Sequence, residues 1–182
     1  MHHPVFPRFV LLCSLLFFYA FSAWAQVLAG RVVGVRDGDT IELLDAGRDL
    51  HVIRLAHIDT PEKSQPFGSR AKQFTSALVG GKTVKVEVTD RDRYGRLVGV
   101  VYLEGSNVNL RIVENGYAWW YRQYSHDVTY GRSELDAFER RSGLWADPRP
   151  VPPWEWRRKK RAASSLQEST RRVFLPHTQV RT

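Results

Sequence analysis

Cysteine is almost absent from this sequence, which contains a single one, Cys13, among 182 residues. One thiol cannot form an intramolecular disulfide, so the packed core must supply the stability of the fold. Cys13 also lies in an apolar segment near the N-terminus. If that segment is removed, the remaining chain has no thiol, which excludes thiol catalysis and cysteine metal sites.

Charge is nearly missing from residues 1–25, in which Arg8 is the one charged side chain. An apolar run from Phe9 to Phe21 follows it, and an Ala-x-Ala sequence ends at Ala25. These are the features of a secretory signal peptide. We therefore expect cleavage before Gln26 and an exported protein, periplasmic or secreted, that has no further contact with the membrane.

An uncleaved membrane anchor is the alternative for the same segment. No charge occurs between Arg8 and Arg31, and about 20 apolar residues can span a bilayer. Strand-like sequence begins already at Val27, however, which would leave almost no spacer between a membrane helix and a folded domain. The pattern favours cleavage.

The excess of positive charge is confined to the C-terminal end. The formal net charge is +8, a sign and size often found in nucleic-acid-binding proteins. Residues 157–182 hold eight basic side chains and one acid, Glu168, whereas residues 26–156 hold 18 of each sign. We expect a formally neutral folded domain over residues 26–156 and a basic, disordered tail over residues 157–182, which has little to bury.

Alternating and β-branched runs, separated by turn signals, predict five strands. They cover approximately residues 30–37, 40–45, 50–58, 83–90 and 96–104. Helical patterns are found at about residues 69–78, 107–115 and 132–142. This order favours an α+β, mainly β fold, a five-stranded OB-type Greek-key barrel with about three helices. The prolines from Asp147 onward predict an extended arm that Trp154 and Trp156 pack onto the barrel.

Three short polar motifs lie on or beside these strands. The first is "DGDT", residues 37–40, in which Asp37-Gly38 predicts a tight turn because glycine accepts a positive φ. The second is "RLAHIDTPE", and the third is "DRYGR". Each has an ordinary structural explanation, since "DTPE" is also typical of a helix start and "YGR" of a turn.

Taken together, in this order and spacing, the motifs resemble the thermonuclease family, the staphylococcal nuclease-like proteins. The resemblance runs from about Gly30 to Trp145 and includes the ending "ERRSGLW", residues 139–145. It implies an OB barrel with helices, in agreement with the strands expected from the patterns alone.

The resemblance implies a metal site and a base. Asp39, Asp59 and the backbone carbonyl of Thr60 would hold Ca²⁺, a hard cation that takes oxygen ligands. Glu62 would activate a water molecule as general base. Arg54 and Asp59 are five residues apart, and a regular strand would point them to opposite faces. The strand must therefore end or bulge between them.

The resemblance also implies phosphate-binding residues. Arg54 and Arg96 would hold the scissile phosphate and stabilise the charge that develops on its oxygens. Tyr94 would lie beside that phosphate or a neighbouring one. The aromatic residues Trp119, Trp120, Tyr121 and Tyr124 either stack on bases or belong to the core.

The resulting expectation is an exported, Ca²⁺-dependent nuclease. It would hydrolyse DNA and RNA by in-line attack of water at phosphorus, leave 3′-phosphate ends, and act as a monomer without a stable protein partner. One alternative is a nucleic-acid-binding OB module without catalysis, and another is a structural or partner-binding envelope protein. Both leave the polar side chains of the three motifs unexplained.

Overall fold

Residues 26–174 are described in the computed structural model of this chain. The expected signal peptide, residues 1–25, and the end of the expected tail, residues 175–182, lie outside the described residues. No helix within residues 26–174 is long and apolar enough to cross a membrane.

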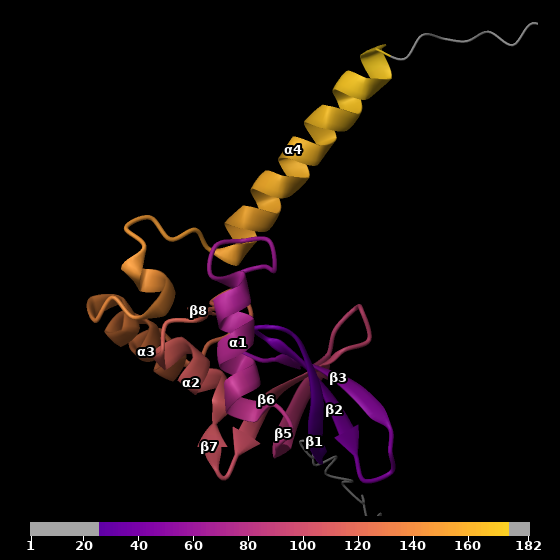
Figure 1. Cartoon of the computed structure of the whole chain (residues 1–182), viewed down its shortest axis with the longest axis vertical. Coiled ribbons are helices and arrows are strands. Elements are labelled where there is room, and N and C mark those ends of the chain that lie inside the picture. The colour runs from indigo at the N-terminus through magenta and orange to yellow at the C-terminus, as the bar shows by residue number, and fades with distance from the viewer. Residues whose placement is uncertain (1–25, 175–182) are drawn as a thin grey trace, which may run out of the picture.

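Five strands form a closed barrel (Figure 1). They are β1 (Gln26–Asp37), β2 (Thr40–Asp45), β3 (Leu50–Leu55), β5 (Thr83–Arg91) and β6 (Leu97–Leu103). Their order is β3-β2-β1-β5-β6, and parallel pairing of β3 with β6 closes the ring while the other pairs are antiparallel. The prediction of an OB-type barrel is confirmed.

Three two-residue strands lie beside the barrel. β4 (Ile58–Asp59) pairs with β8 (Trp119–Trp120), and β7 (Ser106–Asn107) extends the edge at β6. The predicted strand over residues 50–58 is therefore broken after Leu55. His57, with a φ of 69°, forms the turn between β3 and β4.

The three expected helices are present, and they are packed on one side of the barrel. They are α1 (Gly68–Val79), α2 (Val108–Glu114) and α3 (Val128–Glu139). α2 ends at Asn115 and Gly116, where Gly116 has a φ of +70°, as the sequence predicts. α3 begins four residues earlier than expected, because the Asp127 carboxylate accepts a hydrogen bond from the backbone N–H of Thr129. A short 3₁₀ helix, η1 (Gly143–Ala146), follows.

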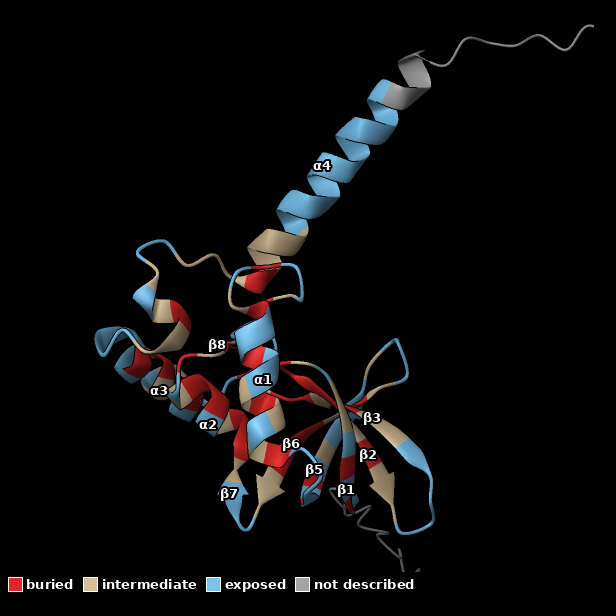
Figure 2. Cartoon of the chain, viewed as in Figure 1, coloured by how far each residue is buried: buried red, intermediate tan, exposed pale blue. Residues whose placement is uncertain are grey.

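The core lies between the barrel and these helices (Figure 2). Alternate residues of the strands point inward, so Val84 and Val86 of β5 are buried while Lys85 between them is exposed. Helix residues such as Ile112 and Tyr130 close the other side of the core. Each fully buried aliphatic side chain stabilises the fold by about 1.5–3 kcal/mol.

The C-terminal segment differs from the expectation of an extended arm and a disordered tail. A fourth helix, α4 (Pro153–Phe174), projects away from the body of the molecule (Figure 1). Pro153 stands at its first position, where a missing N–H costs nothing, and no glycine or proline follows before residue 175. The proline-rich stretch therefore ends at a helix start.

The base of α4 is attached to the body, as expected for Trp154. The Trp154 ring stacks on Tyr121 at 5.8 Å with an interplanar angle of 3° and meets the edge of Trp119 at 6.5 Å. The side chain of Gln65 also donates a hydrogen bond of 2.6 Å to the carbonyl of Val151. Beyond this base, residues 158–170 are exposed (Figure 2).

Candidate active site

The "DGDT" motif forms the hairpin between β1 and β2, one residue later than expected. Asp37 pairs with Thr40, so the two turn residues are Gly38 and Asp39. The φ of Gly38 is not positive. Glycine is needed here for another reason: a Cβ would lie 2.8 Å from Thr60 Oγ1 and 2.9 Å from the Cβ of Ala71. The hairpin therefore packs directly against the "DTPE" segment and α1.

Asp39 is buried and connects the first two motifs. Its Oδ2 accepts hydrogen bonds from the backbone N–H of Thr60 at 2.8 Å and from the Thr60 hydroxyl at 3.0 Å. These two bonds fix the carboxylate in one orientation, because a short side chain with two donors on one oxygen has little freedom left.

Arg54 bridges the two predicted metal-ligand carboxylates. Its Nη1 lies 2.9 Å from Asp39 Oδ2, and its Nη2 lies 3.0 Å from Asp59 Oδ1. This contact is possible because β3 ends between Arg54 and Asp59, as the sequence requires. The Arg54 side chain is 14% exposed, and its planar guanidinium holds both carboxylates on one side of the barrel.

Glu62 and Asp59 share a second arginine, which the sequence reading missed. Arg157, in the first turns of α4, lies 2.7 Å from Asp59 Oδ2 and 2.7 Å from Glu62 Oε1. Nothing in the run "RRKKR", residues 157–161, distinguishes its first arginine from the other four cations. Arg157 lies over the carboxylates because the base of α4 is attached to the body, where Trp154 stacks on Tyr121 and Gln65 bonds to Val151.

Burial and the oppositely charged neighbours shift the pKa values of Asp59 and Arg157 in opposite directions. Burial raises the pKa of the Asp59 carboxyl, although the hydrogen bond from Arg157 and the charge of Arg54 act in the other direction. Burial and then the nearby charge of Asp39 raise the pKa of Asp37 to about 6. Partial burial alone would lower the pKa of Arg157, but its bonds to Asp59 and Glu62 raise it overall.

The third motif supplies Arg96 and Tyr94. Arg96 Nε lies 2.7 Å from Asp92 Oδ2, and its Nη1 donates a 3.4 Å hydrogen bond to the hydroxyl of Thr40 in the "DGDT" hairpin. The Tyr94 ring, 70% exposed, lies 5.7 Å from the Arg96 guanidinium carbon. Arg96 thus stands beside the carboxylates, and Tyr94 lies at the rim.

All the predicted site residues are therefore joined by contacts. Asp39, Arg54, Asp59, Thr60 and Glu62 are linked directly or through Arg157, while Arg96 and Tyr94 adjoin them through Thr40. The aromatic residues after α2 differ in exposure: Trp119 is buried, whereas Tyr124 is 68% exposed.

The carboxylates fit a hard divalent cation. No group of three or more His, Cys, Asp or Glu side chains suited to a metal occurs within the described residues. Two carboxylates, Asp39 and Asp59, nevertheless supply oxygen donors in one place, and Mg²⁺ or Ca²⁺ often completes its shell with carbonyls, water and substrate phosphate. Burial is the main cause of the raised pKa values of Asp37 and Asp59, and a bound cation would favour the charged form of both carboxyl groups.

Residues 52–147 match the family described as "Staphylococcal nuclease homologue". An "Uncharacterized endonuclease" of Escherichia coli O157:H7 is 44% identical over 146 residues, which is 80% of this chain and 95% of that protein. An "Uncharacterized endonuclease" of Haemophilus influenzae is 44% identical over 165 residues, or 90% of this chain and 93% of that protein. The "Micrococcal nuclease" of Shigella flexneri is 41% identical over 154 residues, or 79% of this chain and 87% of that protein. With its OB-type barrel and its joined carboxylates and arginines, this chain belongs to the staphylococcal nuclease family.

Proposed function

We propose that this protein is an exported, Ca²⁺-dependent nuclease that hydrolyses phosphodiester bonds in DNA and RNA. The observation that carries the proposal is the bridge that Arg54 makes between Asp39 and Asp59, with Glu62 beside it across Arg157. Relatives that cover most of the chain and are named as nucleases support the same activity.

Asp39, Asp59 and the backbone carbonyl of Thr60 would hold the cation. A bound divalent ion neutralises charge on a phosphoryl oxygen and makes a coordinated water more acidic. The hydrogen bonds from Thr60 to Asp39 keep that carboxylate in place before any ion arrives. Membership of the staphylococcal nuclease family supports a metal requirement, and the oxygen donor set favours Ca²⁺ or Mg²⁺ over softer metals.

Glu62 would accept the proton of the attacking water. Its side chain is 39% exposed, so solvent water can reach it. Water oxygen forms a bond to phosphorus while the bond from phosphorus to the 5′-oxygen breaks on the opposite side. The leaving oxygen takes a proton from solvent, and the other product carries a 3′-phosphate.

Arg54 and Arg96 would hold the phosphate during this displacement. A guanidinium donates two parallel hydrogen bonds to two phosphate oxygens and so stabilises their growing charge. In the substrate-free chain both arginines pair with carboxylates, Asp39 and Asp59 for Arg54 and Asp92 for Arg96. Tyr94, exposed beside Arg96, would flank the same phosphate or the next one.

A cleavage assay on plasmid DNA and on a single-stranded RNA tests the activity. We expect products with Ca²⁺ and none with a chelator, and we expect 3′-phosphatase treatment to be needed before a polymerase can extend the fragments. Cleavage that persists in chelator would contradict the metal requirement. Binding of DNA without any cleavage would favour the non-catalytic OB module.

Export is a separate part of the proposal. It is supported by the Ala-x-Ala sequence that ends at Ala25 and by the strand-like sequence that begins at Val27. Intact-mass measurement of the protein recovered from the periplasm or the medium should give a chain that begins at Gln26. Recovery of the full-length chain in the membrane fraction would favour the anchor.

A further inference from the structure

A groove lined by charged side chains runs from the candidate active site along α4. It has a volume of about 500 Å³ and lies between the loop after β4, with Glu62 and Ser64, and one face of the helix. Arg157, which pairs with Asp59 and Glu62, stands at its inner end. The groove is therefore continuous with the carboxylates at which cleavage is proposed.

The helical wall of this groove is cationic near the site. Besides Trp156 at the base of α4, it consists of Arg157, Lys160, Arg161, Ser164, Ser165 and Glu168. The last five of these residues lie three, four, seven, eight and eleven positions after Arg157, so they share one face of a helix. Lys160 and Arg161 come one turn after Arg157, a rise of about 5 Å away from the reacting centre.

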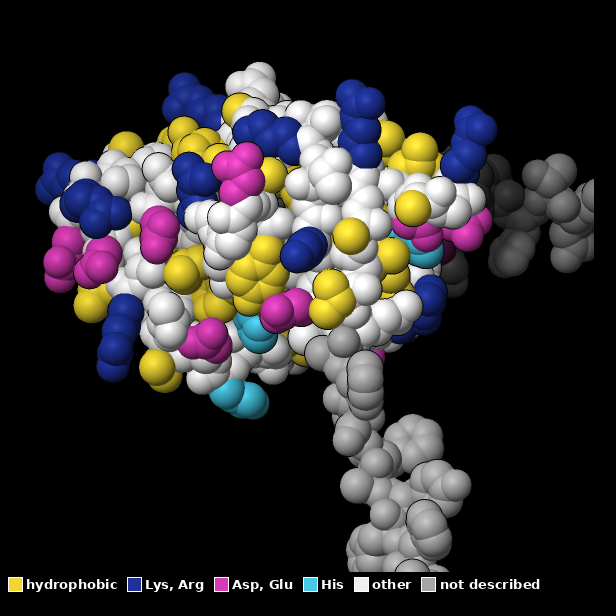
Figure 3. All heavy atoms as spheres, turned by 90° about the horizontal axis from the view of Figure 1, so that it is seen from below, with side chains coloured by type: hydrophobic (Ala, Val, Ile, Leu, Met, Phe, Trp, Pro, Cys, Tyr) yellow, Lys and Arg dark blue, Asp and Glu magenta, His cyan; other side chains and the backbone are white. Residues whose placement is uncertain are grey.

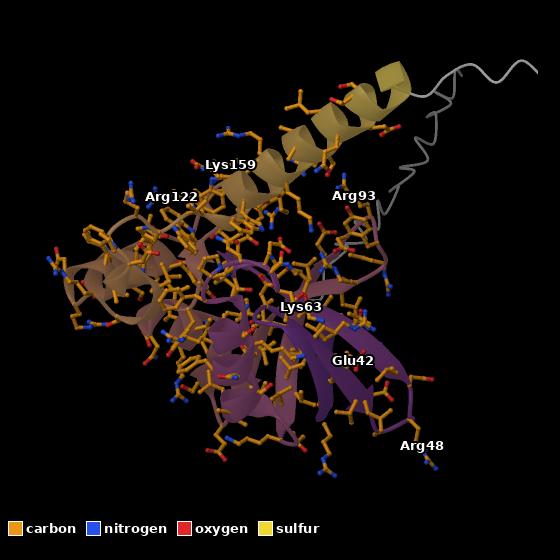
Figure 4. All side chains as sticks on the ribbon, turned by 45° about the horizontal axis from the view of Figure 1, so that its top comes forward. Glu42, Arg48, Lys63, Arg93, Arg122 and Lys159 are labelled. Atoms are coloured by element: carbon orange, nitrogen blue, oxygen red, sulfur yellow. The ribbon has the colours of Figure 1, made fainter. Side chains whose placement is uncertain are left out.

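Arg158 and Lys159 have the same charges and lie in the same turn, but they do not line the groove. Both are exposed. Figure 4 labels Lys159 on α4, together with Lys63 in the loop after β4 and Arg93 in the β5–β6 loop. The helix thus carries two equal pairs of cations, one toward the groove and one away from it.

The position of this wall is fixed by three contacts at the base of α4. They are the stack of Trp154 on Tyr121, the hydrogen bond from Gln65 to Val151, and the ion pairs of Arg157. A mobile basic tail would attract any polyanion without preference. A helix held at a fixed angle beside the catalytic groups places its charges at fixed points along a bound strand.

The charge of α4 also contrasts with that of the barrel. On the face of the molecule shown in Figure 3, basic and acidic side chains alternate and form no continuous patch of one sign. Residues 26–156 are formally neutral. The positive charge that would attract a polyanionic substrate is therefore concentrated on α4, next to the reacting centre.

We propose that the groove between the loop at residues 62–64 and α4 is a subsite for the phosphodiester backbone beside the scissile bond, with Lys160 and Arg161 as its phosphate-binding side chains. The ligand is a single strand of nucleic acid, whose phosphates follow one another along the helix. The proposal rests on the proposed nuclease function and adds the part of the substrate that lies next to the cleaved bond.

The test compares Lys160→Ala/Arg161→Ala with the control Arg158→Ala/Lys159→Ala in the full chain. Both variants lose two charges from the same turn. Binding of a fluorescent 12-nucleotide single strand is measured in chelator over a range of salt, with a gel to show that the strand stays intact. Turnover is measured with Ca²⁺ on the same strand and on an activated thymidine phosphodiester too short to reach α4.

We expect the groove variant to bind the 12-nucleotide strand about tenfold more weakly, with a log–log salt slope reduced by about 1.4, since each phosphate contact on a single strand contributes about 0.7. Its KM for this strand should rise to a similar extent with kcat unchanged, and the small diester should be cleaved as by the parent. The control should change each value by less than twofold.

Equal losses in both variants would overturn the subsite, because they would show that α4 acts only as diffuse charge. No loss in either variant would overturn it as well. If the parent protein cleaves neither substrate, the nuclease function itself has failed, and the small diester makes this outcome distinguishable from failure of the subsite alone.

Discussion

Glu62 and Asp39 have different proposed tasks, so their substitutions should fail in different ways. Glu62→Gln keeps the size of the side chain but removes the proton acceptor, and we expect turnover to fall roughly 10²- to 10⁴-fold with Ca²⁺ binding retained. Asp39→Asn removes a metal ligand, and its loss should be partly recovered at high Ca²⁺. Turnover as a function of Ca²⁺ concentration separates the two. Parent-like turnover in both variants would remove these carboxylates from the mechanism.

Arg157 should compete with the cation for Asp59, because its Nη2 lies 2.7 Å from Asp59 Oδ2. We expect Arg157→Gln to tighten Ca²⁺ binding in the absence of substrate by about fivefold, the factor that corresponds to an ion pair worth ~1 kcal/mol. Calorimetric titration measures this directly. Arg158→Gln, which removes the neighbouring exposed charge, is the control and should bind Ca²⁺ as the parent does. A weaker affinity in Arg157→Gln would mean that this arginine positions Asp59 for the ion.

At the level of single residues, the sequence motifs predicted a group of side chains that the structure brings together, but they did not indicate Arg157. Asp39, Arg54, Asp59, Thr60, Glu62, Tyr94 and Arg96 are brought together as expected. Their motifs lie at the ends of strands, where local pattern and pairing agree. Arg157 is contributed by a segment 95 residues beyond Glu62, and its place depends on the packing of Trp154 rather than on any local pattern.

Among the elements, the "DGDT" hairpin couples fold and site most closely. Gly38→Ala would push a methyl group to 2.8 Å from Thr60 Oγ1 and 2.9 Å from the Ala71 Cβ, so we expect a destabilisation of about 1–3 kcal/mol and a raised Ca²⁺ requirement, because Asp39 moves with the turn. Urea unfolding and the Ca²⁺ dependence of turnover measure the two effects.

Gly105→Ala is the matched control for this hairpin. Gly105 has a φ of +80° with no atom within 4 Å of an added Cβ, and a left-handed alanine costs about 1–2 kcal/mol. It should destabilise the fold to a similar degree and leave the Ca²⁺ requirement unchanged. A raised requirement in Gly105→Ala would show that lost stability alone explains the effect at Gly38.

The sequence predicts the helices and strands whose hydrophobic periodicity is strong. It does not predict features that depend on cross-strand pairing or on packing between distant segments. Alternation located the five barrel strands, but the turn at "DGDT" shifted by one residue because register is set by cross-strand pairing, here Asp37 with Thr40. The prolines before α4 predict the start of an extended arm. Pro153 begins a helix instead, and residues 154–174 contain good helix formers and no proline or glycine.

At the scale of the whole molecule, the site is a region in which stability and cation binding should be linked. Asp39 and Asp59 are buried, with 6% and 1% of their surface exposed. Burial raises the pKa of Asp59 even though two arginines pair with it. An ion that binds the folded chain and not the unfolded one stabilises it by about 2.7 kcal/mol at a concentration of 100 Kd. For a domain of this size that corresponds to a rise in Tm of about 5–10 °C.

Thermal unfolding with Ca²⁺, and again after addition of chelator, measures this linkage without any reference to cleavage. We expect the rise in the parent protein and in Glu62→Gln, since Glu62 is not a proposed ligand, and we expect its loss in Asp39→Asn. The groove variant Lys160→Ala/Arg161→Ala should keep the full rise, because its charges lie outside the carboxylate pair. An equal rise in Asp39→Asn would mean that the ion binds elsewhere on the chain, and the carboxylates bridged by Arg54 would then need a different role.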